Sequence, residues 1–116
     1  MPRPVVFFTY AHPVEGSVIL SRTGDAVELR VHWPIDRSTD EWFDFAGRWS
    51  GETFERRLAE LRERGATRLP GHPRGFADLT AVPGAGRIVL HLATSEAYPR
   101  DELRLILPAD PGDLAP

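Results

Sequence analysis

Four side-chain types are missing from this 116-residue chain, which has no cysteine, lysine, asparagine or glutamine. Without cysteine there can be no disulfide, no thiol nucleophile and no cysteine-based zinc site. Without lysine there is no Schiff-base amine and no Walker-type phosphate site, and without asparagine there is no N-glycosylation acceptor. The missing amides also exclude Asn and Gln as donors to an oxyanion. Enzyme mechanisms that depend on these groups are therefore excluded.

Long apolar runs and an excess of positive charge are missing as well. No stretch of the sequence has the length and apolarity of a membrane span, and the N-terminus lacks the order of a signal peptide. We therefore expect a cytoplasmic protein without a membrane partner. All 14 positive charges are arginine, which is typical of a G+C-rich bacterial genome, and the net charge is −3. That balance argues against a nucleic-acid partner, because nucleic-acid binding needs a basic surface.

The length of the chain predicts one domain with its own hydrophobic core. A chain of 116 residues can bury about two thirds of its unfolded surface without metals or disulfides. We expect residues 1–108 to form a single compact α+β domain. Residues 109–116, which are rich in proline, glycine and acids, are expected to form a flexible C-terminal tail.

The segment between Ser38 and Gly65 carries two sets of apolar residues at helical spacing. The two sets point in directions that differ by roughly 130° at 100° per residue, so one straight helix cannot bury both. The polar pair Ser50 and Gly51 separates them, because serine is a good N-cap and glycine is weak inside a helix. We therefore expect a bent or split helical segment over residues 39–64. The first set is Trp42, Phe45, Ala46 and Trp49, and the second is Phe54, Leu58 and Leu61.

Strand patterns lie on both sides of this segment. Alternation of apolar and polar residues, or runs of β-branched and aromatic residues, marks three strands before it and three after it. The short Gly- and Pro-containing connections are of hairpin length, and residues 66–75 are expected to be a loop. The order βββ-αα-βββ predicts an α+β fold, mainly an antiparallel sheet packed on one face by the helical segment. The expected strands are 5–11, 17–22, 27–33, 76–82, 87–94 and 102–107.

Two groups of histidines are candidates for chemistry. His72 and Arg74 lie in a loop stiffened by prolines, where an imidazole and a guanidinium could orient a carboxylate or phosphate. His32 and His91 lie in strands and could meet through strand pairing, which makes them weak candidates for a metal site or an acid–base pair. No two potential ligands show a recognised metal-binding spacing, so we expect no metal and no cofactor.

Crowded aromatic residues suggest a binding surface. Phe43 lies off the arc of its helical neighbours, and the change of direction at Gly51 could leave an apolar stripe without an internal partner. An exposed aromatic face beside arginine and glutamate is typical of a protein interface or a homodimer contact. The candidate surface residues are Phe43, Trp49, Phe54 and Arg56.

These features favour a small protein-binding module, of the type of immunity or antitoxin inhibitors and regulatory adaptors. It would bind another protein or a second copy of itself, through the helical segment or an exposed sheet edge. The alternative is a small-molecule enzyme or ligand-binding domain in which His72 and Arg74 act with a carboxylate. An exposed apolar patch would favour the first function, and an aromatic-lined pocket with converging polar groups would favour the second. The lack of a catalytic motif makes a non-enzymatic role the primary expectation.

Overall fold

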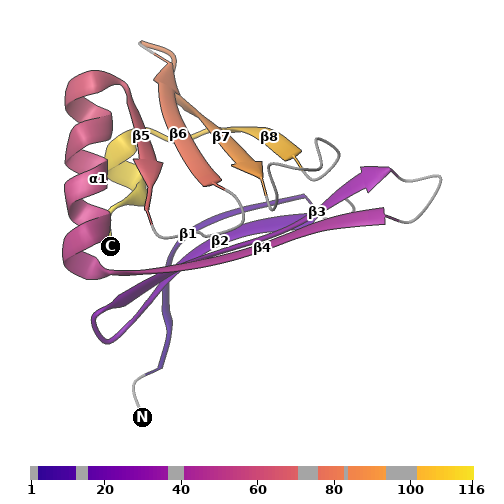
Figure 1. Ribbon diagram of the computed structural model, residues 1–116, viewed down its shortest axis with the longest axis horizontal. Coiled ribbons are helices and arrows are strands. Elements are labelled where there is room, and N and C mark those ends of the chain that lie inside the picture. The colour runs from indigo at the N-terminus through magenta and orange to yellow at the C-terminus, as the bar shows by residue number, and fades with distance from the viewer. Residues whose placement is uncertain (1–2, 13–15, 37–40, 71–75, 83, 94–101) are drawn as a thin grey trace. The chain divides into compact units, whose positions relative to one another are not determined.

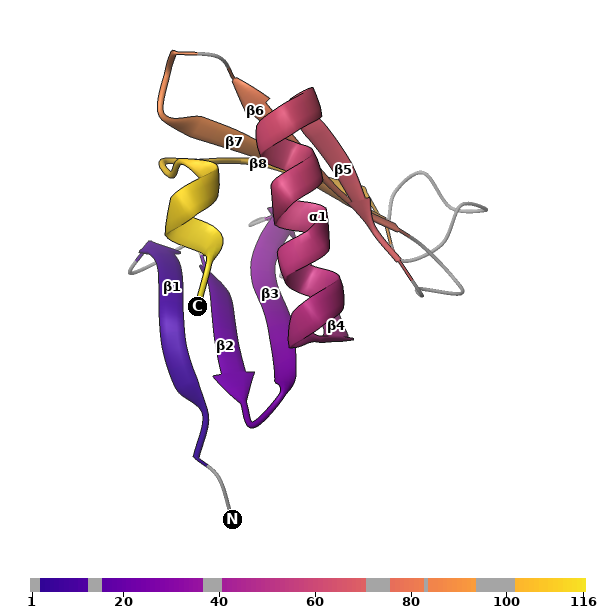
Figure 2. The ribbon, with the colours of Figure 1, turned by 90° about the vertical axis from the view of Figure 1, so that its left-hand side faces the viewer.

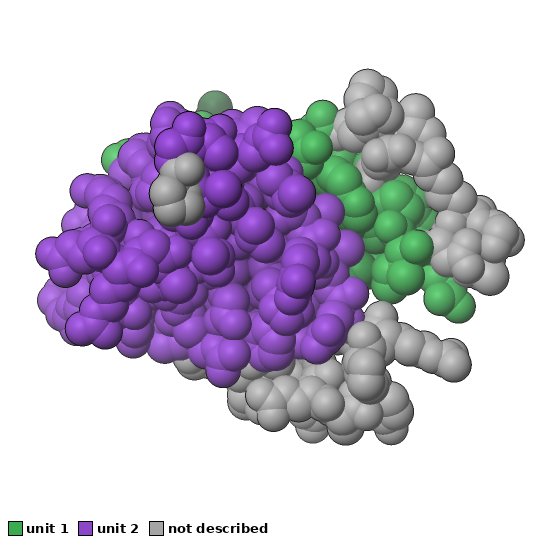
Figure 3. Space-filling model, turned by 90° about the horizontal axis from the view of Figure 1, so that it is seen from above, with its two compact units in different colours: residues 1–51, 116 green, residues 52–115 purple. Residues whose placement is uncertain are grey.

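A computed structural model describes residues 3–12, 16–36, 41–70, 76–82, 84–93 and 102–116 (Figure 1). The described chain is α+β, with two antiparallel sheets of four strands each and one α-helix, α1 (Gly51–Arg64), between them in the sequence. The chain divides into two compact units, residues 1–51 with residue 116, and residues 52–115 (Figure 3). The strands are β1 (Val5–His12), β2 (Gly16–Thr23), β3 (Ala26–Asp36), β4 (Glu41–Ser50), β5 (Ala66–Leu69), β6 (Phe76–Val82), β7 (Arg87–Ala93) and β8 (Glu102–Leu107).

The first sheet is a meander in the order β1-β2-β3-β4, and Figure 2 shows β1, β2 and β3 side by side. The predicted antiparallel meander of the first three strands is confirmed. Val27, Leu29 and Val31 of β3 are buried, while Arg30 and His32 between and beyond them are exposed. The predicted alternation therefore gives the sheet one buried face and one outer face.

The first predicted helical piece is wrong, because residues 41–50 form strand β4. Burial alternates strictly along it, with Phe43, Phe45, Gly47 and Trp49 buried and the residues between them exposed. The residues predicted to share a helical arc can also lie on an extended chain; they are Trp42, Phe45, Ala46 and Trp49. Strand pairing decides between helix and strand, because β4 runs antiparallel to β3 along nearly its whole length. Aromatic residues are favoured on such a half-buried pleated surface. The order is therefore ββββ-α-ββββ, with one α-helix in the described chain.

Helix α1 corresponds to the second predicted piece. It begins at Gly51, so the predicted break at this residue is a boundary between a strand and a helix. Phe54, Leu58 and Leu61 form its buried stripe, each with no more than 1% of its surface exposed. The helix ends at Arg64. The next residue, Gly65, has a φ of 78°, the left-handed conformation that glycine favours, and its N–H donates to the Leu61 carbonyl over 2.9 Å.

The second sheet is a meander in the order β5-β6-β7-β8. The predicted hairpin of β6 and β7 is confirmed, as is strand β8. The predicted loop is wrong at its start, because Ala66–Leu69 is strand β5 and pairs with β6. A strand of four residues between a helix-ending glycine and a proline gives too short an alternation to be recognised in the sequence.

The C-terminal segment 109–116 contains a short 3₁₀ helix, η2 (Pro111–Leu114). Ala109 and Leu114 are buried, with exposed fractions of 2% and 1%. The Asp110 N–H donates to the Asp113 carboxylate over 2.8 Å, which satisfies a backbone donor at the start of the helix. These two buried side chains lie within the segment that was predicted to be a flexible tail.

Candidate functional site

A row of polar side chains crosses the outer face of the first sheet. Strand pairing places Ser17 of β2 opposite His32 of β3, and His32 opposite Asp44 of β4. Residues paired across antiparallel strands carry their side chains on the same face, with Cβ atoms about 5 Å apart. The fold therefore brings a hydroxyl, an imidazole and a carboxylate into one row from three separate strands.

Asp44 fixes the orientation of the His32 ring. His32 Nδ1 lies 2.5 Å from Asp44 Oδ1, and both side chains are more than half exposed. An ionised carboxylate only accepts hydrogen bonds, so Nδ1 carries the hydrogen and donates it. In the neutral ring the other nitrogen, Nε2, then holds the lone pair and can accept a proton.

Trp42 covers one face of the same imidazole. The centroids of the two rings are 4.2 Å apart and their planes differ by 2°, which is a stacked arrangement. Trp42 pairs with Pro34 of β3, one step along the outer face from the row that contains His32 and Asp44. The His32 ring is thus held at one edge by a hydrogen bond and on one face by an aromatic contact.

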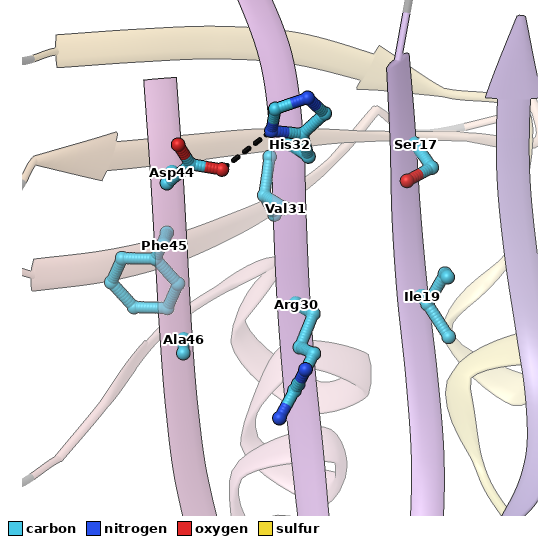
Figure 4. Close-up of a pocket in the computed structure, with 8 residues that line it drawn as sticks. All are labelled: Ser17, Ile19, Arg30, Val31, His32, Asp44, Phe45 and Ala46. Atoms are coloured by element: carbon cyan, nitrogen blue, oxygen red, sulfur yellow. Dashed lines mark hydrogen bonds and ion pairs between the residues drawn. The ribbon is translucent and has the colours of Figure 1, made fainter. Parts of the chain in front are cut away.

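A hollow of about 520 Å³ lies over this row (Figure 4). The neighbouring row on the same face supplies Ile19, Arg30 and Ala46, which are paired across the three strands. Arg30 Nε donates to the Glu28 carboxylate, and the Arg30 side chain is 70% exposed. The hollow therefore combines apolar contact, a guanidinium and an oriented imidazole. Its lining residues are Ser17, Ile19, Arg30, Val31, His32, Asp44, Phe45 and Ala46.

A second polar row crosses the second sheet. Arg68 of β5 donates two hydrogen bonds, of 2.7 and 3.0 Å, to the Asp78 carboxylate of β6. The Arg68 guanidinium also lies 4.6 Å from the centroid of the Phe76 ring. His91 of β7 is opposite Asp78, contacts Phe76 edge-on and lies 3.6 Å from the Glu102 carboxylate. Arg68 and Asp78 neutralise each other and His91 lies near the Glu102 carboxylate, so these contacts are suited to linking neighbouring strands of the sheet.

The first sheet ends in an edge strand without charge. Sheet order puts β1 at one end, so only β2 pairs with it among the described strands. Residues 5–11, VVFFTYA, contain no charged side chain. Val5 and Val6 are 65% and 56% exposed, and Thr9 and Ala11 are also exposed. Folded proteins usually protect such an edge with charge, proline or cover, since unpaired backbone groups on an apolar strand attract another strand.

The structure separates the residues of the predicted binding surface. Phe43, Trp49 and Phe54 are buried, with exposed fractions of 3%, 7% and 1%. Arg56 is exposed and pairs with Glu52 one helical turn away, at 3.0 Å. The three aromatic side chains therefore belong to the buried part of the chain, and Arg56 to an ion pair at the surface of α1.

The predicted histidine sites differ in outcome. His72 and Arg74 lie outside the described residues. His32 and His91 belong to different sheets, so strand pairing does not join them, and each has its own carboxylate neighbour. Within the described ranges there is no group of three or more histidine and carboxylate side chains arranged to hold a metal ion.

Sequence reasoning missed Ser17, Asp44 and Trp42. Asp44 lies within the segment 39–64 for which helix was predicted, and that prediction hid its pairing with His32 on a neighbouring strand. The signal that could have found it is the alternation of aromatic and polar residues over Glu41–Ser50, which fits a fourth strand after the meander. Register, which decides what lies opposite His32, is a property of the folded sheet.

No protein-family model, curated protein or solved structure matches the chain. Within the described part of the chain, no helix combines the length and apolarity needed to cross a membrane.

Proposed function

We propose that this chain is a protein-binding module, of inhibitor or adaptor type, whose edge strand β1 pairs with β1 of a second copy. The observation that carries the proposal is the absence of acidic and arginine side chains from that edge strand, Val5–His12. An exposed apolar edge strand makes an isolated chain prone to aggregation, and pairing with another strand covers that edge. Strand addition supplies backbone hydrogen bonds for affinity and side-chain contacts for selectivity.

The sequence of β1 favours a second copy of the chain as its pairing partner. A symmetric antiparallel pair brings the side chains nearest the twofold axis close to their own counterparts, so a charge near the centre of the edge would repel its copy. Residues 5–11 contain no such charge. Pairing two β1 strands would extend the first sheet across the twofold axis, and the backbone groups of both edges would be satisfied.

The regular part of the edge is Phe8–His12. The pairing of β1 with β2 shifts register between Val6 and Phe8, which marks a bulge at Phe7. A bulge bends a strand and ends regular pairing. The stretch after it pairs without interruption with β2, so it is the part able to form a second ladder. Thr9 and Ala11 lie in this stretch and are exposed, opposite Ile19 and Ser17 on the outer face.

Charge substitution at Thr9 tests the proposal. Sedimentation velocity of the wild type from about 10 µM to about 1 mM should show a monomer–dimer equilibrium, since 1 mM reveals even an association worth about 4 kcal/mol. Thr9→Lys should shift it to monomer, because two added ammonium groups near the twofold axis would repel each other. An equimolar mixture of Thr9→Lys and Thr9→Glu should restore the dimer.

The matched control is Thr80→Lys, which makes the same change at an exposed position of β6, an interior strand of the second sheet. It should leave the equilibrium of the wild type unchanged. A wild type that stays monomeric throughout the concentration range would overturn the proposal. So would a dimer that Thr9→Lys does not weaken, or a mixture of opposite charges that does not associate.

A further inference from the structure

We propose that Ser17, His32 and Asp44 form a hydrolytic site for carboxylic esters on the outer face of the first sheet. Ser17 is the nucleophile and His32 the general base, while Asp44 is a positioning residue that acts through His32. This activity is separate from the pairing of β1, because the three residues lie on β2, β3 and β4. The arrangement uses the roles that recur in serine hydrolases on unrelated folds, which are recognised by geometry.

The imidazole is prepared for the role of base. Its Nδ1 is occupied by the hydrogen bond of 2.5 Å to Asp44, so the neutral ring carries its lone pair on Nε2. The parallel, stacked indole of Trp42 prevents the imidazole from rotating about its Cβ–Cγ bond, because rotation would drive the ring into the indole, whose centroid is 4.2 Å away. A base fixed in one tautomer and one orientation loses little entropy when it accepts a proton.

Ser17 lies on the opposite side of His32 from Asp44. The two residues are direct partners across β2 and β3, and the hydroxyl of Ser17 lies on the side of β2 that faces β3 (Figure 4). Ser17 Oγ has no hydrogen-bond partner among the described residues. The proposed pair would close by rotation about χ1 of Ser17 alone, which leaves the contacts of His32 with Asp44 and Trp42 in place; nucleophile–base pairs commonly tighten when substrate binds.

The residue before Ser17 shows why β2 can approach His32 here. Gly16 has a φ of 106°, and a Cβ on it would overlap the His32 carbonyl and lie 3.0 Å from Trp33 Cα. Only glycine tolerates both the backbone conformation and the close contact. Gly16 therefore lets β2 begin directly against the backbone of His32, which fixes the position of Ser17.

The hollow indicates the substrate class. Ile19 and Ala46 offer apolar contact for a short acyl chain, one row from Ser17 and Asp44. Arg30 lies between them on β3, and its guanidinium is the cationic donor that lines the hollow. The Arg30 side chain extends away from Ser17 and donates to Glu28, so it does not reach the reacting carbonyl oxygen (Figure 4). A carboxylic ester with a short acyl chain fits the apolar contacts of Ile19 and Ala46.

The reaction balances with water as the only co-reactant. Ser17 Oγ bonds to the ester carbonyl carbon while His32 Nε2 takes the hydroxyl proton. The carbon–oxygen bond of the leaving group then breaks, and His32 gives the proton to the departing alcohol. Water attacks the acyl-serine with His32 again as base, and the acyl group leaves as a carboxylic acid with Ser17 regenerated.

Labelling with a fluorophosphonate tests the nucleophile. The reagent should form a serine–phosphorus bond with loss of fluoride, and peptide mapping by mass spectrometry should place the adduct on Ser17. Ser17→Ala and His32→Ala should abolish the adduct. The matched control is Ser21→Ala, which removes a hydroxyl from the same strand at a position opposite Glu28, and it should label as the wild type does. No adduct, or an adduct elsewhere, would overturn the proposal.

Hydrolysis of p-nitrophenyl butyrate separates serine catalysis from attack by imidazole alone. Ser17→Ala should lower kcat/KM on the order of 10²-fold, the usual contribution of a nucleophile–base pair, and Ser21→Ala should not change it. If Ser17→Ala keeps the wild-type rate while His32→Ala loses it, His32 acts alone and the assignment of Ser17 is wrong.

A spectroscopic measurement isolates the role of Asp44. The ¹⁵N shifts of the His32 ring in the wild type should show the Nδ1–H tautomer. Asp44→Asn should change that tautomer population and lower kcat more than KM, with the secondary structure retained by circular dichroism. Unchanged ring shifts in Asp44→Asn would show that Asp44 does not position the base.

Discussion

The indole of Trp49 lies directly over Gly47, two residues earlier on the same face of β4. A Cβ on Gly47 would overlap the six-membered ring of Trp49, with Cζ2 at 2.7 Å, and would lie 3.0 Å from Phe45 Cε1. Because Gly47 has no side chain, the indole of Trp49 can occupy the space above it. Trp49 is 7% exposed as a result, and it is part of the buried face of the sheet.

Gly47→Ala should destabilise the protein by about 1–3 kcal/mol, because the added methyl group overpacks a rigid aromatic contact. Urea denaturation followed by tryptophan fluorescence measures the change. Gly112→Ala is the control, since a Cβ on Gly112 meets no atom within 4 Å, and it should alter stability by less than about 0.5 kcal/mol. Equal midpoints for the two variants would contradict the packing of Trp49 on Gly47.

Phe54→Ala should cost about 3–5 kcal/mol, the range for removing a fully buried aromatic side chain. The free energy of unfolding in urea is again the readout. Arg56→Ala on the same helix should change stability by less than about 0.5 kcal/mol, because the side chain is 73% exposed. A loss below about 1 kcal/mol for Phe54→Ala would mean that this ring is not core, and the surface predicted from the sequence would regain support.

The ion pair of Arg68 and Asp78 should contribute at most about 1 kcal/mol, since the arginine is 59% exposed and screened by water. A double-mutant cycle with Arg68→Ala and Asp78→Ala measures the coupling energy. It should shrink as sodium chloride is raised, because salt screens exposed charges. A coupling energy of several kcal/mol that does not fall as salt is raised would contradict the description of Arg68 and Asp78 as an ordinary surface ion pair.

Trp42→Ala should shift the NMR resonances of the His32 ring, because the stacked indole and its ring current are removed. The stability change should stay within about 1.5 kcal/mol, the usual range for an aromatic pair. Trp42→Phe keeps a ring on the imidazole and should move the resonances less. Unchanged His32 resonances in Trp42→Ala would contradict the stacking.

Local sequence patterns were enough to predict much of the fold. The alternation of Val27, Leu29 and Val31 identified β3, and glycine-containing turns joined it to β2 and joined β6 to β7. The break at Gly51 and the stripe of α1 that follows it were also readable. These features depend on residues close together in sequence, where period and turn chemistry operate.

The candidate site depends on information that a local pattern does not contain. Residues 42–49 fit a helical arc and a strand equally well until β3 is available as a pairing partner. Only then does Asp44 fall opposite His32, since a shift of one residue would turn it to the buried face. Burial of Phe43 and Trp49 follows from the same pairing, which is why aromatic residues expected at a surface lie inside.

Amide hydrogen exchange along β1 tests the central claim, that this edge binds a second copy of the chain, most directly. The measurement compares the amides of Phe8–His12 at about 10 µM and about 1 mM, with the interior strand β6 as the internal reference. Pairing predicts that the outward-facing amides of this stretch exchange more slowly at the higher concentration while those of β6 do not change. Exchange in Phe8–His12 that is the same at both concentrations would contradict the account.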